Sequence, residues 1–113
     1  MEHPIATLAL QARRSANSEE FPVSVSVGAP YRRPNGSWGC PLELTGLHGR
    51  LADVVGEDSF QALCLAIVLA GNLLRAFVDG GGRLRSLGDD PEDLFPLEAY
   101  FGASGPSSAE GAA

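Results

Sequence analysis

One long helix is predicted by the stretch from Gly56 to Ala70, which reads GEDSFQALCLAIVLA. Asp58 is a good N-cap residue, and Gln61 three residues later completes an approximate capping box. The apolar pattern continues to about Asp79, which gives a helix of roughly twenty residues and ~30 Å. Glycines at positions 80 to 82 then supply the left-handed conformation that commonly ends a helix. The fold is therefore expected to be built around this helix.

Three segments before the helix show the alternation of apolar and polar residues that is typical of β-strands. Phe21 to Val27 alternates most clearly, and Ile5 to Gln11 has a weaker pattern. Trp38 to Thr45 also alternates, but Pro41 has no N–H to donate, which predicts an edge strand or an unpaired position there. After the helix, Arg83 to Leu87 is expected to form a short last strand.

These elements predict an α+β fold, an antiparallel sheet of about four strands that is covered on one face by a single long helix. The order is strand, strand, strand, helix, strand. Residues 1–101 are expected to form a single domain, with the segment 94–101 docked on the core. Residues 102–113 are predicted to be a flexible low-complexity tail. The strand order in the sheet, and whether residues 47–55 form a strand, are left open.

Composition narrows the classes of function. The chain has 113 residues and a formal net charge of -6, and its eight basic residues are all arginine. A negative protein lacks the positive surface that binding to nucleic acid or to an anionic membrane requires. The longest apolar run, at positions 62–70, is much shorter than the ~20 residues of a membrane span, and the start of the chain does not resemble a signal peptide. We therefore expect a cytoplasmic protein.

One side of the predicted helix combines polar and apolar residues. At ~100° per residue, Gln61, Asn72 and Arg75 share a side from which Leu65 and Val68 also project. An apolar stripe on the expected solvent side needs a cover, which is the segment 94–101, a second copy of the chain, or another protein. These five residues are the predicted interface.

The opposite side of the helix is the expected core side. Trp38 and Phe60 are expected to be core anchors as well. The predicted core residues of the helix are Leu63, Ile67, Ala70, Leu74 and Val78.

The leading functional expectation is a non-enzymatic protein-interaction module that forms a homodimer through the long helix. One alternative is an immunity-like protein whose acidic cluster neutralises a basic toxin. The other is a small-ligand-binding domain or an unrecognised enzyme that uses His48, Cys40 or the two arginine pairs. The acidic cluster consists of Asp89, Asp90, Glu92 and Asp93, and the arginine pairs are Arg13-Arg14 and Arg32-Arg33.

No catalytic, cofactor-binding or metal-binding residue is predicted. His3 and His48 do not stand at metal-ligand spacing from each other or from a cysteine. Cys40 and Cys64 lie in elements expected to be buried, which favours free thiols. The glycines at 80 to 82 end a helix and lack the lysine of a phosphate-binding loop.

Several short motifs occur in a fixed order, namely Trp38-Gly39-Cys40, Leu47-His48-Gly49, Gly56-Glu57-Asp58-Ser59-Phe60-Gln61-Ala62-Leu63 and Gly80-Gly81-Gly82-Arg83-Leu84. With these motifs the chain resembles a family of small uncharacterised bacterial proteins, a domain of unknown function. That family has a Trp-x-Cys strand and a Gly-x-Asp-Ser-x-Gln-Ala-Leu helix. The resemblance spans about positions 20 to 100. It implies the same fold and a bacterial cytosolic origin, and it implies no catalytic residue.

Overall fold

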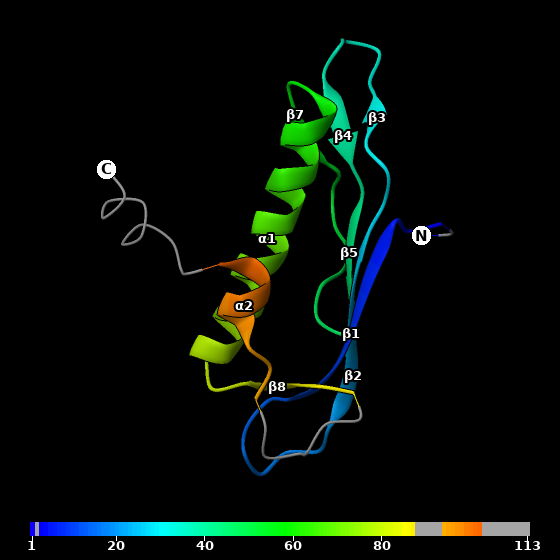
Figure 1. Ribbon diagram of the computed structural model, residues 1–113. Coiled ribbons are helices and arrows are strands. Elements are labelled where there is room, and N and C mark those ends of the chain that lie inside the picture. Colours follow the sequence, from blue (N-terminus) through cyan, green and yellow to red (C-terminus); the bar gives the residue numbers. More distant parts are fainter. Residues whose placement is uncertain (2, 88–93, 103–113) are drawn as a thin grey trace, which may run out of the picture.

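The computed structural model describes residues 1, 3–87 and 94–102, and it confirms the α+β class (Figure 1). Strands precede and follow one long helix, and a short helix packs near the end of the described chain. The elements are β1 Ala6–Arg13, β2 Phe21–Val27, β3 Tyr31–Arg32, β4 Trp38–Cys40, β5 Leu42–Thr45, β6 Gly49–Arg50, β7 Val54–Gly56, α1 Ser59–Asp79, β8 Arg83–Ser86 and α2 Leu97–Phe101.

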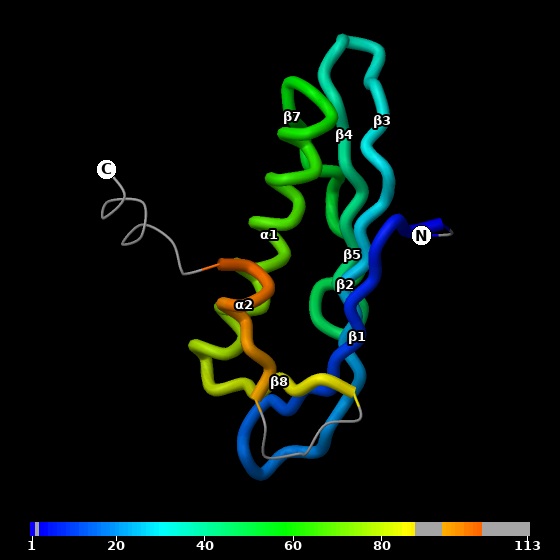
Figure 2. The backbone as a smooth tube through the Cα atoms, viewed as in Figure 1, coloured from blue at the N-terminus to red at the C-terminus, as the bar shows by residue number. Residues whose placement is uncertain are grey.

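The strands form two antiparallel sheets. The larger sheet has the order β6-β5-β2-β1-β8, and the smaller sheet has the order β3-β4-β7. The structure has more strands than the predicted four, partly because one long hairpin bends and each of its arms is thereby divided into two strands. Its arms are β2 with β3 and β4 with β5, and Figure 2 shows them running along α1.

The bend of this hairpin lies at Gly28 and Pro41. The Gly28 N–H donates to the Pro41 carbonyl at 2.9 Å, and a Cβ at Gly28 would lie 3.0 Å from the Pro41 ring. Pro41 has no N–H for the ladder, so the predicted strand at 38–45 divides into β4 and β5 at this residue. The segment left open by the sequence, 47–55, contributes β6 and most of β7.

The ends of α1 follow the predicted signals. The Gln61 N–H donates to Asp58 Oδ1 at 2.7 Å, and the Glu57 N–H donates to Gln61 Oε1 at 2.7 Å, so the arrangement resembles a capping box whose return bond comes from the residue before the N-cap. At the other end, Gly81 has φ +107°, and the Gly82 N–H donates to the Phe77 carbonyl at 2.9 Å. The start and the end of the helix were therefore predicted from local chemistry.

The core lies where α1 packs against strands of both sheets. In β2 the three valines at 23, 25 and 27 are buried, as the alternating pattern predicted. The core also contains Leu10 and Ala12 of β1, Leu42 and Leu44 of β5, Leu84 of β8, and Ala62, Ala66, Ala70 and Leu74 of α1.

The predicted core side of α1 is wrong in part. Ala70 and Leu74 are buried as expected, but Ile67 is 39% exposed and the expected anchor Phe60 is 74% exposed. The buried side is turned toward Ala62 and Ala66. Small side chains allow α1 to lie close to its neighbours, as at Gly56, where a Cβ would lie only 2.5 Å from the Ala62 nitrogen.

Other expectations have mixed outcomes. Trp38 is half-buried and packs against the core.

Within the described part of the chain, α1 has the length and the hydropathy of a membrane-crossing helix, properties that it shares with core helices of soluble proteins. The acidic cluster at 89–93 and the predicted tail at 103–113 lie outside the described residues.

Candidate functional site

The N-terminal half of α1 has a side with large apolar residues that is open to solvent. Phe60 is 74% exposed, Val68 54%, Leu65 41% and Ile67 39%. Cys64 is half-buried and lies one helical turn from both Phe60 and Val68. These five residues are called the α1 outer face below. A patch of this kind on a small protein is typical of a surface that is covered by a partner.

The C-terminal segment covers a later part of this side of α1. Phe101 of α2 packs on Gly71, where a Cβ would lie 2.9 Å from three atoms of the Phe101 side chain. Arg75 Nη2 donates to the Gly102 carbonyl at 3.0 Å and fastens the end of α2 to α1. The described part of this segment leaves Leu65 and Val68 exposed. It therefore does not provide the cover that the sequence left open.

The five predicted interface residues differ in what they contact. Gln61, Leu65, Val68 and Asn72 are exposed, and Arg75 is half-buried. The Gln61 side chain accepts the Glu57 N–H in the capping box, and Arg75 holds the end of α2. The two hydrogen-bonded polar residues, Gln61 and Arg75, thus support the fold of their own chain.

Sequence reasoning missed Phe60 and Ile67 as members of this surface. The available signal was side-chain size. Alanine recurs at positions 62, 66 and 70, with the four-residue spacing of one helix side, and such a side can approach a sheet closely. The large residues must then point elsewhere.

A shallow apolar groove lies on the other side of α2. Its volume is about 150 Å³, and Phe101 forms one wall of it. Because Phe101 also packs on Gly71, Phe101 lies between the groove and α1. The other large lining residues are Leu8, Val25, Val27 and Tyr100.

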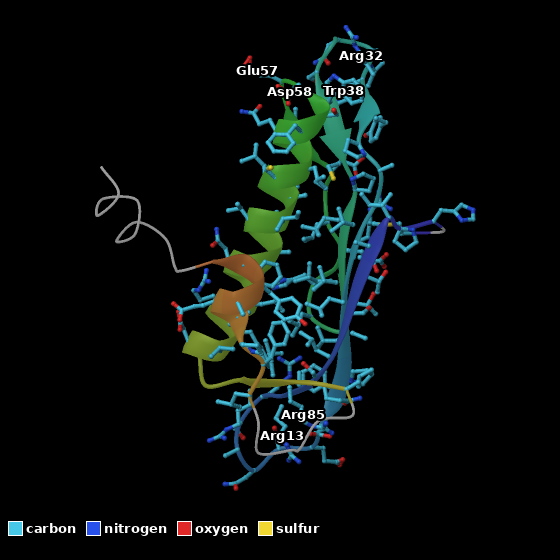
Figure 3. The ribbon with its side chains drawn as sticks, viewed as in Figure 1. Arg13, Arg32, Trp38, Glu57, Asp58 and Arg85 are labelled. Carbon is cyan, nitrogen blue, oxygen red and sulfur yellow. The ribbon has the colours of Figure 1, made fainter. Side chains whose placement is uncertain are left out.

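Arginine and glutamate side chains line a pocket at the end of the molecule away from the start of α1, where Figure 3 labels Arg13 and Arg85. Arg85 Nε and Nη2 donate to the two carboxylate oxygens of Glu20 at 2.6 and 2.9 Å. Arg13 Nε lies 3.7 Å from Glu20 Oε2, and Arg13 Nη1 donates to the Ser18 carbonyl at 2.6 Å. The hydrogen bonds from Arg85, helped by the charges of Arg85 and Arg13, hold the pKa of Glu20 below its ordinary value.

A second polar cluster lies on the smaller sheet. The Tyr31 hydroxyl donates to Asp53 Oδ2, and Arg50 Nη2 donates to Asp53 Oδ1 at 3.0 Å. These hydrogen bonds, with the charges of Arg50 and Arg33, lower the pKa of Asp53, and the bond to Asp53 raises the pKa of Tyr31. The Tyr31 ring packs over Gly39, where a Cβ would lie 2.9 Å from the ring. The cluster therefore ties β3 to the segment that leads into β7.

The residues of the ligand-binding alternative do not assemble into one site. The two arginine pairs lie at opposite ends, as Figure 3 shows for Arg13 and Arg32. Cys40 is fully buried, and burial raises the pKa of its thiol, which disfavours a reactive thiolate. His48 is exposed on the loop after β5. Within residues 1, 3–87 and 94–102, no three potential metal ligands form a group.

Comparison with known proteins identifies the family. Residues 9–96 match a family described as a domain of unknown function (DUF6968). The match covers more than half of the chain, so the chain belongs to this family, and the resemblance to an uncharacterised domain is confirmed. No curated protein and no solved structure matches the chain.

Proposed function

We propose that this DUF6968 protein is a protein-interaction module that pairs with a second copy of itself through the α1 outer face. The observation that carries the proposal is the exposure of Phe60, Leu65 and Val68 on a helix whose opposite side is in the core. Removing apolar surface from water stabilises a complex by about 25 cal/mol per Å² before the losses of entropy on association.

The charge distribution favours a second copy as the partner. Positions 59–74 contain no charged residue, whereas the whole chain has a net charge of -6. An uncharged face can meet its own copy without bringing like charges together. Isologous pairing about a two-fold axis is also the commonest form of homo-oligomer.

The spacing of the outer face suggests where the axis would lie. Cys64 is four residues from both Phe60 and Val68, so it lies at the middle of the patch. In an antiparallel pair of helices centred there, Phe60 of each copy would meet Val68 of the other. The two Cys64 thiols would then lie close to the axis.

The first test is the mass of the protein in solution by light scattering. The wild-type protein should have twice the 11.8 kDa mass of the chain. The double variant Leu65→Asp with Val68→Asp should be a folded monomer, because both side chains are exposed. The matched control is Leu87→Asp, which changes a leucine that is 53% exposed outside the patch. It should remain a dimer.

A monomeric wild-type protein at high concentration would contradict the proposal. So would equal loss of the dimer in the control, because a general effect of added charge would then explain the result. Circular dichroism of each variant separates loss of pairing from loss of folding.

A second test uses the native cysteines. Mild oxidation of the wild-type dimer should produce a disulfide-linked pair of chains through Cys64, and Cys64→Ser should abolish it. Cys40 is fully buried and provides an internal control, since Cys40→Ser should leave the crosslink unchanged. In the cytoplasm, where we expect this protein, the thiols would stay reduced and the pairing would be non-covalent. A crosslink that survives Cys64→Ser would contradict an axis near this residue.

A further inference from the structure

A pocket with a volume of about 190 Å³ lies beside β1 and β8, and no residue of α1 lines it. Its polar lining residues are Gln11, Arg13, Glu20, Arg83 and Arg85. The apolar part of the lining comes from Ala16, Leu84 and Leu94. The pocket is smaller than the ~300–1,000 Å³ typical of drug-sized ligands. It suits a small anion with a short organic part.

The strand register places the arginines together. Arg13 pairs with Arg83 and Gln11 pairs with Arg85 between β1 and β8. The intervening Ala12 and Leu84 are buried, so the pocket residues of β1 lie on the side of the sheet opposite the core. Two like charges directly opposite each other on neighbouring strands destabilise a sheet. This placement is unfavourable unless a negative group lies between them.

Glu20 supplies only part of that negative charge. Both of its oxygens are engaged by Arg85, and its nearer oxygen is 3.7 Å from Arg13 Nε. Arg83 is exposed and has no ion pair within the described residues. Arg83 therefore lines the pocket without a carboxylate partner in that part of the chain, and Arg13 has only the longer contact with Glu20.

We propose that this pocket binds the phosphoryl group of a small molecule between Arg13 and Arg83. The guanidinium fork matches the oxygen geometry of phosphate, and the Gln11 amide adds a neutral donor. The described lining contains three arginines and one glutamate, a net charge of two positive, and a phosphate monoester carries about −1.5 to −2 at neutral pH. Glu20 acts as a positioning residue that keeps Arg85 in place beside the anion.

The test is titration of the full chain with inorganic phosphate and with glycerol 3-phosphate, at constant ionic strength with chloride as the reference anion. Amide and arginine Nε–H signals in NMR spectra are the readout. Saturable shifts are expected in β1 and β8, at the residues around Arg13 and Arg83. Tighter binding of glycerol 3-phosphate would identify an organic phosphate as the ligand, and equal binding would identify phosphate itself.

Two variants make the test specific. Arg83→Ala should weaken binding roughly tenfold to a hundredfold, because a hydrogen bond to a charged group is lost. The affinity of Arg83→Lys for phosphate should lie between those of Arg83→Ala and the wild type, since lysine keeps the positive charge but lacks the planar pair of N–H donors. The matched control Arg32→Ala removes another exposed arginine, at the other end of the molecule, and should bind as the wild type does.

Two results would overturn the proposal. One is the absence of saturable shifts with either phosphate at millimolar concentration. The other is equal weakening in Arg83→Ala and Arg32→Ala, which would show a general effect of charge. Neither result depends on pairing through α1, because the pocket and the α1 outer face share no residue.

Discussion

The side of α1 that faces the sheet consists largely of small residues, whereas much of the side open to solvent carries large ones. Ala62, Ala66 and Ala70 are almost completely buried, while Phe60 and Val68 are more than half exposed. Hydrophobicity alone would place the larger residues inside. The difference teaches that contact distance also decides which side of a helix is buried, since a close helix-to-sheet approach selects alanine.

The largest contrast between the two sides is expected for leucine truncation. Leu74 is fully buried, and Leu74→Ala should lower the free energy of unfolding by about 2–5 kcal/mol through lost burial and the remaining cavity. Leu65 is 41% exposed, and Leu65→Ala should change the stability of the monomer by only about 0.5 kcal/mol or less. Urea unfolding monitored by circular dichroism at low protein concentration measures both. Equal losses would show that the outer face belongs to the core of the monomer.

The next contrast concerns added volume. Ala66→Leu introduces a larger side chain at a fully buried position and should cost about 1–3 kcal/mol of unfolding free energy. Ala76→Leu is the matched control, because the same change at an exposed position of the same helix should cost about 0.5 kcal/mol or less. If the two variants unfold at the same urea concentration, close packing of α1 on the sheet is not what buries the alanines.

Much of the fold could be predicted from local sequence. The strand Phe21–Val27 has the bounds expected from its alternation, and α1 begins after Asp58 because its cap chemistry is local. The rotation of α1 about its axis could not be predicted from hydrophobicity, because apolar residues nearly surround the helix. That rotation depends on what α1 packs against, which is determined by distant parts of the chain.

The candidate sites show the same limit. Leu65 and Val68 could be selected from helical spacing alone. Arg13 and Arg83 are seventy positions apart, and only the register of β1 with β8 brings them together. The sequence suggested that Arg13-Arg14 and Arg32-Arg33 could act together. Those pairs lie at opposite ends of the molecule, as Figure 3 shows for Arg13 and Arg32. Charged residues far apart in a sequence gain a shared role only through strand pairing.

The smallest effect on the isolated monomer is expected for Phe60→Ala. Phe60 is 74% exposed, so its truncation should change the unfolding free energy of the monomer by about 0.5 kcal/mol or less. The dimer should behave differently, because association adds stability that grows with protein concentration. The melting temperature of the wild type should therefore rise with concentration, and the rise should be smaller for Phe60→Ala. The matched control is Tyr100→Ala, an aromatic residue that is 58% exposed on α2, outside the α1 outer face. A wild-type melting temperature that is independent of concentration would mean that the large residues of α1 do not pair with a second copy.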